Sequence, residues 1–338
     1  MDEQTALDLP ALRGHLDQAV PGLVSGDLEA TLLAGGHSNL TFLISDGVGR
    51  WVLRRPPLGH TDPSTHDMAR EFTVMAALAG SGVPVPALVH ECLDPEVLGA
   101  PFYLSEFVDG TVYRTVEQTA GLGAERARAV SFELVDVLVD IHALDPGAVG
   151  LGGFGRPDGF LERQVKRWTG LAEEVLSDIV GVGRLVADIR STKPQTTRSG
   201  IVHGDYRLDN VMVSEDARIV AVLDWEMAAL GDPLTDLGLL QCYWTGVINP
   251  GGDAMRKGID PELGFPDFDE LARRYAERSG TSLDSLPWYA AFGYLKLAVL
   301  RGRIHQRFLA GNTPPGFETV GDLIQPLVTA SRHTLEDL

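Results

Sequence analysis

The stretch HGDYRLDN, residues 203–210, decides how this sequence is interpreted. It brings one histidine, two aspartates and one asparagine together directly before an apolar run. A second polar group follows in AVLDWEMAALGDPLTD, residues 221–236, where Asp224 ends another apolar run. A charged surface loop would account for the first stretch alone. The two stretches together indicate a polar loop that is supported by a hairpin.

The segment between the two stretches, NVMVSEDARIVAVLD at 210–224, predicts a β-hairpin with its turn near Asp216 and Ala217. Paired residue numbers in an antiparallel hairpin have a constant sum. A turn at that point therefore predicts that Asn210 and Asp224 lie side by side at the open end. Asp205 lies in the loop that leads into the first strand.

These residue types suit phosphoryl transfer from ATP. Magnesium prefers oxygen ligands, so Asn210 and Asp224 are the candidate ligands. Asp205 is placed to orient an acceptor hydroxyl and to take its proton. We expect His203 to support the loop by a hydrogen bond, and Asp236 to accept a hydrogen bond from the loop. The alternative is a polar loop whose acids face water, with Asp236 as a solvated acid in a first helical turn.

The order of the predicted elements indicates an α+β fold of two lobes, because strands come first and helices follow. The N-terminal lobe, 1–105, has an antiparallel sheet and one helix, 106–110 is a hinge, and 111–338 is a larger, mainly helical lobe. Strands are expected at 28–45 around a glycine turn, and at 50–57, 101–110, 211–213 and 219–223. Helices are expected at 62–82, 126–146, 233–245, 268–279 and 287–310.

The N-terminal lobe carries candidate nucleotide contacts. Glu71 lies within the apolar stripe of its helix, and a buried carboxylate needs a cation. Arg54 or Arg55 of the third strand would supply it, and alternation of strand faces does not choose between them. Two segments would contact nucleotide through backbone groups and short side chains: the turn AGGHSN, with Gly36, Ser38 and Asn39, over phosphates, and SEFVDG, with Glu106 and Val108, at adenine.

Composition excludes several classes of function. The formal net charge is −19, from 28 Lys and Arg against 47 Asp and Glu, which argues against a nucleic-acid partner. The first residues lack a signal-peptide pattern, and the most apolar late stretch is too short to span a bilayer and contains Lys296. With two cysteines, Cys92 and Cys242, a reducing cytoplasmic location without a membrane partner is expected. Composition leaves the oligomeric state open.

From about residue 28 to 310 the chain resembles the aminoglycoside phosphotransferase and choline kinase family. It looks most like the kinase domains fused to acyl-CoA dehydrogenases and their stand-alone bacterial relatives, through segments such as GGHSNLTFLI, WVLRRPP and LERQVKRW. The resemblance implies a bilobal protein-kinase-like fold that binds ATP with two Mg²⁺ ions. It implies Asp205 as catalytic base, Asn210 and Asp224 as metal ligands, and Glu71 paired with Arg54, where most kinases carry lysine.

The acceptor is expected to be anionic, such as a hydroxyacyl-CoA or a hydroxy acid. The late helix carries Lys296, Arg301, Arg303 and Arg307 and no acid, and LERQVKRW is also basic. The three arginines are therefore candidate acceptor contacts. Alternatively these cations lie on solvated helix faces and neutralise the acidic remainder of the chain. A second alternative is a true aminoglycoside kinase that confers antibiotic resistance. A third alternative is a pseudokinase that binds nucleotide without catalysis.

Overall fold

The computed structural model describes residues 7–33, 39–58, 68–246, 259–313 and 316–336. Gly36 and Ser38 lie outside these described residues. The chain divides into two compact units. Unit 1 runs to Thr111 and includes Val220–Ala228, and unit 2 contains Val112–Ile219 and the residues from Ala229 onward. The lobe and hinge boundaries expected from the sequence stay a prediction.

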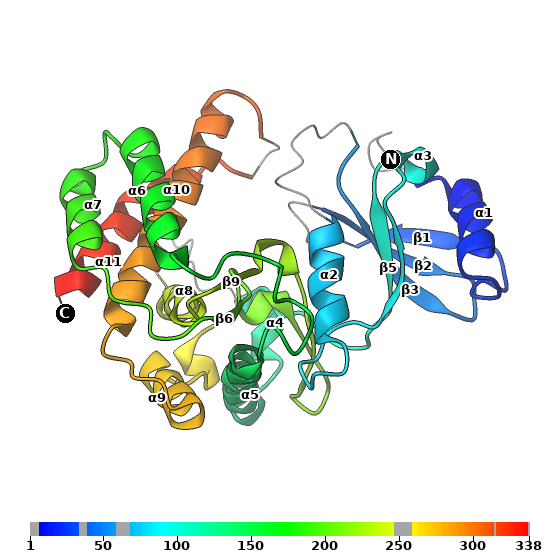
Figure 1. The fold of residues 1–338 in the computed structure, drawn as a ribbon, viewed down its shortest axis with the longest axis horizontal. Coiled ribbons are helices and arrows are strands. Elements are labelled where there is room, and N and C mark those ends of the chain that lie inside the picture. The colour runs from blue at the N-terminus through cyan, green and yellow to red at the C-terminus, as the bar shows by residue number, and fades with distance from the viewer. Residues whose placement is uncertain (1–6, 34–38, 59–67, 247–258, 314–315, 337–338) are drawn as a thin grey trace. The chain divides into compact units, whose positions relative to one another are not determined.

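Unit 1 is built on a five-stranded antiparallel sheet with the order β1-β2-β3-β5-β4 (Figure 1). The sequence predicted four of these strands and did not predict β4, whose residues lack clear alternation. The strands are β1 (Glu29–Leu32), β2 (Leu40–Ser45), β3 (Arg50–Arg55), β4 (Leu88–Cys92) and β5 (Phe102–Glu106).

Helices cover both faces of this sheet (Figure 1). On one face α1 (Leu9–Ala19) packs Leu12 and Leu16 against strand residues that include Leu53. On the other face lies α2 (Met68–Leu78). The short helix α3 (Pro95–Leu98) contributes Leu98 to the same apolar cluster as α1. The sequence predicted α2 as the one helix of this lobe and missed α1 and α3. Because strand residues alternate, Arg54 points toward α2, whereas Arg55 points into the face that α1 covers.

Unit 2 is mainly helical, which confirms the expected α+β fold. The sequence predicted α5, α8, α9 and α10 and missed the other helices. The helices are α4 (Val116–Ala120), α5 (Ala124–Ala143), α6 (Phe160–Val175), α7 (Val182–Ser191), α8 (Leu234–Thr245), α9 (Phe268–Ser279), α10 (Leu286–Leu309) and α11 (Ile324–Glu336). The short strands β6 (Gly200–Val202) and β9 (Ala229–Gly231) pair with each other.

The strands β7 (Val211–Val213) and β8 (Ile219–Val222) pair as the sequence predicted. Their turn closes with Ser214 N–H donating to Arg218 O at 2.8 Å, and Ala217 adopts a left-handed conformation, φ 59°. This three-residue turn with a left-handed third position sets a register two residues away from the one we predicted. The register argument that paired Asn210 with Asp224 is therefore wrong.

Helices α8 and α10 approach each other closely at glycines. A Cβ atom at Gly238 would lie 2.5 Å from the backbone carbonyl carbon of Tyr289. One at Gly293 would lie 2.8 Å from Cys242 Sγ. Both positions therefore require glycine for close packing. In the described part of the chain, no helix combines the length and apolarity needed to cross a membrane.

The α8–α10 contact makes a prediction about stability. Gly238→Ala should lower the free energy of unfolding by about 1–3 kcal/mol, because the new methyl group meets backbone that cannot move aside. Gly170→Ala in α6 is the matched control, since a Cβ atom there has no neighbour within 4 Å. That control should stabilise by roughly 0.5–1 kcal/mol through helix propensity. Denaturant unfolding of both variants is the measurement, and equal effects would contradict the close packing.

Candidate functional site

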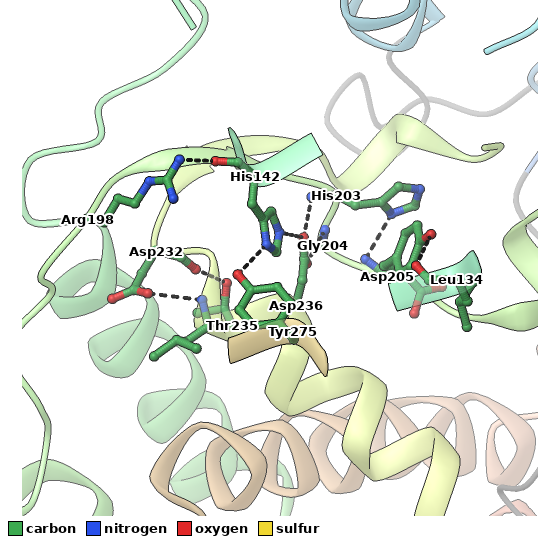
Figure 2. A network of polar contacts seen from close by, with 12 residues as sticks. Leu134, His142, Arg198, His203, Gly204, Asp205, Asp232, Thr235, Asp236 and Tyr275 are labelled. Atoms are coloured by element: carbon green, nitrogen blue, oxygen red, sulfur yellow. Dashed lines mark hydrogen bonds and ion pairs between the residues drawn. The ribbon is translucent and has the colours of Figure 1, made fainter. Parts of the chain in front are cut away.

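The loop 203–210 is anchored by one buried carboxylate (Figure 2). Asp236, in the first turn of α8, accepts the backbone N–H of His203 at 2.7 Å and that of Gly204 at 2.8 Å. Gly204 has φ 89°, a conformation that favours glycine. The carboxylate thus fixes the backbone immediately before Asp205.

Asp236 is held in turn by a histidine of α5 (Figure 2). His142 Nε2 lies 3.2 Å from Asp236 Oδ2, and His142 Nδ1 lies 2.8 Å from the Tyr275 hydroxyl. Burial alone would raise the pKa of Asp236, but the hydrogen bond and charge of His142, with smaller contributions from His203 and Gly204, hold it below its ordinary value. The sequence analysis did not single out His142, although a histidine on the apolar face of a helix was a usable signal.

Three side chains contact the Asp205 carboxylate within unit 2, two by hydrogen bonds and one by an ion pair. The Tyr243 hydroxyl donates to Oδ1 at 3.0 Å, Asn210 Nδ2 donates to Oδ2 at 3.1 Å, and Arg207 Nε lies 3.2 Å from Oδ2. The Asp205 side chain still keeps 24% of its surface exposed. Burial raises its pKa, although the charges of Arg207 and His203 and the hydrogen bond from Tyr243 oppose this effect. The carboxylate is therefore oriented but reachable.

Sequence reasoning missed Arg207 and Tyr243. The Arg207 guanidinium stacks 4.7 Å from the centroid of the Tyr243 ring and also pairs with Asp209 at 3.0 Å. Arg207 stands inside the motif and was a usable signal. Tyr243 lies 38 residues after Asp205, and no local pattern connects the two.

The remaining loop residue, His203, is fully buried. Its Nδ1 accepts the backbone N–H of Asp205 at 3.3 Å, and its ring meets Tyr206 edge-on. His203 therefore contacts two other residues of the loop, as expected of a supporting residue.

In unit 1, Arg54 bridges two carboxylates. Its Nη1 lies 3.1 Å from Glu71 Oε1, and its Nη2 donates to Asp224 Oδ1 at 2.6 Å. Burial alone would lower the pKa of Arg54, but the charges of Glu71, Tyr103 and Asp224 outweigh burial and raise it. The guanidinium fork makes both contacts at once, which a single ammonium does less well. Of the two arginines left open by the sequence, Arg54 is the one that contacts Glu71.

The segment after Asp224 is also held within unit 1. Asp224 itself adopts a left-handed conformation, φ 68°, at the start of the 3₁₀ turn η2 (Trp225–Met227). Asn39 Nδ2 donates to Glu226 Oε2 at 3.3 Å, and Arg70 donates to the carbonyl of Ala228 at 2.7 Å. These contacts hold the backbone that carries the Asp224 carboxylate.

The expected adenine contacts lie at the end of β5. Glu106 is exposed, and its backbone N–H donates to Ala87 O at 2.8 Å. Phe107 N–H donates to Arg50 O at 3.2 Å, and Val108 is half-buried. The N–H groups of residues 106 and 107 are thus occupied within unit 1.

The candidate ligands suit a hard cation. Both hydrogen bonds of the Asn210 side chain use Nδ2, which directs Oδ1 away from them, and the Asp224 carboxylate is 29% exposed. Magnesium commonly takes one or two protein oxygens and completes its shell with water and phosphate. Within the described ranges, no group of three or more His, Cys, Asp or Glu side chains is arranged to hold a metal.

The predicted acceptor arginines lie in the C-terminal half of α10. Arg303 and Arg307 are exposed, and Arg301 is half-buried. The structure places them on the helix as the sequence predicted, and their role stays a prediction.

Comparison with known proteins identifies relatives of the whole chain. The model of the phosphotransferase enzyme family matches residues 29–277. Acyl-CoA dehydrogenase family member 10 of Mus musculus is 34% identical over 90% of this chain and 29% of its own length. Acyl-CoA dehydrogenase family member 11 of Rattus norvegicus is 32% identical over 98% of this chain and 44% of its own length. The chain thus spans less than half the length of these curated relatives.

Solved structures agree with this result. A crystal structure of an aminoglycoside phosphotransferase candidate from Ralstonia eutropha is 30% identical, with a TM-score of 0.84 over 98% of this chain and 99% of that one. A complex of aminoglycoside phosphotransferase APH(4)-Ia with AMP-PNP and hygromycin B is 18% identical, with a TM-score of 0.60 over 96% of this chain and 98% of that one. The second likeness concerns the fold alone.

The Asp236 anchor predicts a pH-dependent loss of stability. Asp236→Asn should lower the free energy of unfolding by about 1–3 kcal/mol at neutral pH, because an amide has one acceptor oxygen for two backbone N–H groups. The pKa of Asp236 is lower in the folded protein than in the unfolded chain, where it is roughly 3.9. Asp236 therefore contributes its full stabilisation above that unfolded pKa and loses it as the pH falls through the folded pKa. The difference between wild type and variant should therefore shrink below about pH 4.

Asp140→Asn is the control for this experiment, because Asp140 is an exposed acid of α5 that pairs with Arg278. Its effect should stay within about 0.5 kcal/mol. Thermal unfolding between pH 3 and 7 measures both variants. A variant-to-wild-type difference that grows toward low pH would contradict the assignment of Asp236.

Proposed function

The chain belongs to the phosphotransferase enzyme family, and on this premise we propose that it transfers the γ-phosphoryl group of ATP to a hydroxyl group of a small anionic acceptor. Family membership carries the coarser statement that the chain is a small-molecule kinase. One observation supports the reaction itself. Asp205 is a partly buried but reachable carboxylate oriented by Tyr243, Asn210 and Arg207 in a loop whose backbone is anchored.

Asp205 is the proposed catalytic base. An acceptor hydroxyl that donates to this carboxylate is oriented toward the γ-phosphorus. Its proton passes to Asp205 as the bond between the acceptor oxygen and the γ-phosphorus forms, while the bond from that phosphorus to the β,γ-bridging oxygen breaks and ADP leaves. A pKa raised by burial makes the carboxylate a better proton acceptor in that step. Tyr243 and Arg207 position the carboxylate.

Asn210 and Asp224 are the proposed magnesium ligands, and ATP is the proposed phosphoryl donor. Two bound ions would offset the negative charge of the phosphates. Arg54, oriented by Glu71, contacts the phosphates. In the same proposal Gly36, Ser38 and Asn39 lie over the phosphates, and Glu106 and Val108 contact adenine.

The proposed acceptor is anionic, with a hydroxyacyl-CoA or a hydroxy acid as the leading class. The names of the curated relatives associate this type of domain with acyl-CoA dehydrogenases. The C-terminal half of α10 is basic and therefore also favours an anionic acceptor, with Arg301, Arg303 and Arg307 as candidate contacts. A phosphorylation screen of hydroxy acids, hydroxyacyl-CoAs and aminoglycosides tests the class directly. Turnover of polycations alone would favour the aminoglycoside kinase.

The role of Asp205 predicts a specific kinetic pattern. Asp205→Asn should lower kcat by about 100-fold or more, while the Kd for ATP changes little, because the residue faces the acceptor. Tyr243→Phe keeps the ring and removes one hydrogen bond, so kcat should fall by roughly 10-fold. Steady-state kinetics with the acceptor from the screen measure both variants. An unchanged kcat for Asp205→Asn would remove this residue from the mechanism.

The Arg54 bridge predicts energetic coupling. A double-mutant cycle of Arg54→Lys and Glu71→Gln, measured as nucleotide affinity by calorimetry, should show a coupling free energy above about 0.5 kcal/mol. The cause is that lysine cannot contact Glu71 and Asp224 with the geometry of a guanidinium fork. The exposed pair Arg13 and Asp17 on α1 supplies the control cycle, which should be additive. Additivity in the Arg54 cycle as well would show that the bridge does not influence nucleotide binding.

A further inference from the structure

Among the described residues, Lys296 of α10 has no carboxylate partner. It is half-buried in a run of buried residues that includes Leu295 and Leu297. Throughout the described part of the chain, no carboxylate forms an ion pair with it and no acceptor forms a hydrogen bond. Placing an ammonium group among apolar side chains is costly unless something interacts with its charge. This position therefore requires an explanation.

An aromatic ring holds the ammonium in place. Lys296 Nζ lies 5.5 Å from the centroid of the Trp168 ring. Trp168 of α6 is 4% exposed, and its Nε1 donates to Gln164 Oε1 at 3.1 Å. A cation–π contact positions an ammonium group but uses none of its three N–H donors. The donors of Lys296 thus remain available to a ligand.

The ammonium group belongs to the part of α10 that crosses α8. Cys242 Sγ lies 3.1 Å from Ala290 O and would touch a Cβ atom at Gly293, one turn before Lys296. Tyr243, the next residue of α8, donates to Asp205. Long side chains on a helix point back toward its N-terminus, so the Lys296 side chain extends toward this crossing. Burial lowers the pKa of Lys296, whereas the charges of Asp236 and Asp205 oppose that effect.

Neither of these two carboxylates needs Lys296. Asp236 already has His142 and two backbone N–H groups, and Asp205 already has Tyr243, Asn210 and Arg207. A structural ion pair would bring the ammonium into contact with one of them. Lys296 instead lies over the indole ring of Trp168.

We propose that Lys296 binds an anionic oxygen group of the acceptor, a carboxylate or a phosphate, while the acceptor hydroxyl lies at Asp205. This inference rests on the proposed function and specifies how its site selects the acceptor. Arg167 of α6 strengthens the selection, because its guanidinium lies 5.5 Å from the centroid of the Trp168 ring. The two cations around one indole ring favour an anion and repel a polycation. Lys296, rather than the three arginines of α10, is then the principal acceptor contact.

The test compares one acceptor in three forms: a hydroxycarboxylate, its neutral methyl ester and its CoA thioester. Wild type should prefer at least one anionic form over the methyl ester in kcat/KM. Lys296→Met keeps the length and apolar stem and removes the charge. It should lower kcat/KM for the preferred anionic form by about 10- to 100-fold, the range for a hydrogen bond to a charged group. The KM for ATP and the kcat/KM for the methyl ester should stay unchanged.

Two further variants separate this role from a structural one. Lys166→Met removes an exposed lysine of α6 and should leave all three acceptors unaffected. Lys296→Arg keeps a cation on Trp168 and should retain most of the preference for the anion. The form whose turnover falls in Lys296→Met identifies the source of the anionic group, which is the carboxylate for the free acid and the CoA phosphates for the thioester.

Three results would overturn the inference. If Lys296→Met lowers kcat/KM equally for the anionic forms and the neutral ester, the lysine supports Asp205 and does not bind the acceptor. If wild type prefers the anion and Lys296→Met keeps that preference, another residue selects the acceptor and the proposed function stands. If wild type phosphorylates only polycations, the proposed acceptor class fails, and the inference about Lys296 fails with it.

Discussion

The carboxylate of Asp236 is the constraint on which the geometry of the loop 203–210 depends. Two consecutive backbone N–H groups donate to it, and a buried peptide group without an acceptor would cost about 1–3 kcal/mol. The carboxylate is itself buried, so it needs the partner that His142 supplies. Loop, α5 and α8 are therefore fixed to one another through a single side chain. The position of Asp205 follows from that arrangement.

In unit 1 a single charged side chain also joins several elements, but here it is a cation. One guanidinium, that of Arg54, contacts Glu71 of α2 and Asp224 at the end of the β8 segment. Because Arg54 lies on β3, the sheet, the helix and the segment after β8 share one polar junction. Most kinases carry lysine at this position. Arginine keeps the positive charge but changes the arrangement of the donors, because its planar guanidinium can contact two carboxylates at once. The Asp224 carboxylate is thereby oriented by the protein.

Sequence patterns predicted the parts of this protein that depend on local chemistry. The strands that flank Asp205 and Asp224, the helix that carries Glu71 and the candidate ligands all lie in short motifs. Contacts distant in sequence were not predictable in this way, as Tyr243 with Asp205 and His142 with Asp236 show. The hairpin register failed for a different reason. Ala217 adopts a left-handed conformation that alanine rarely takes, so the turn type could not be read from its residues.

The charge of the whole chain and the charge near Asp205 argue in opposite directions about the acceptor. A net charge of −19 repels anions at long range, but salt screens that repulsion beyond roughly 8–10 Å. The carboxylates of Asp205 and Asp236 have local donors that offset their charge, whereas Lys296 has an indole ring and, within the residues that the structure describes, no counter-ion. Selection of an anionic acceptor by this protein therefore has to come from short-range contact, where a partly desolvated ammonium interacts far more strongly than an exposed one. Attraction between surface charges would weaken steeply with salt, whereas a contact of this kind would not.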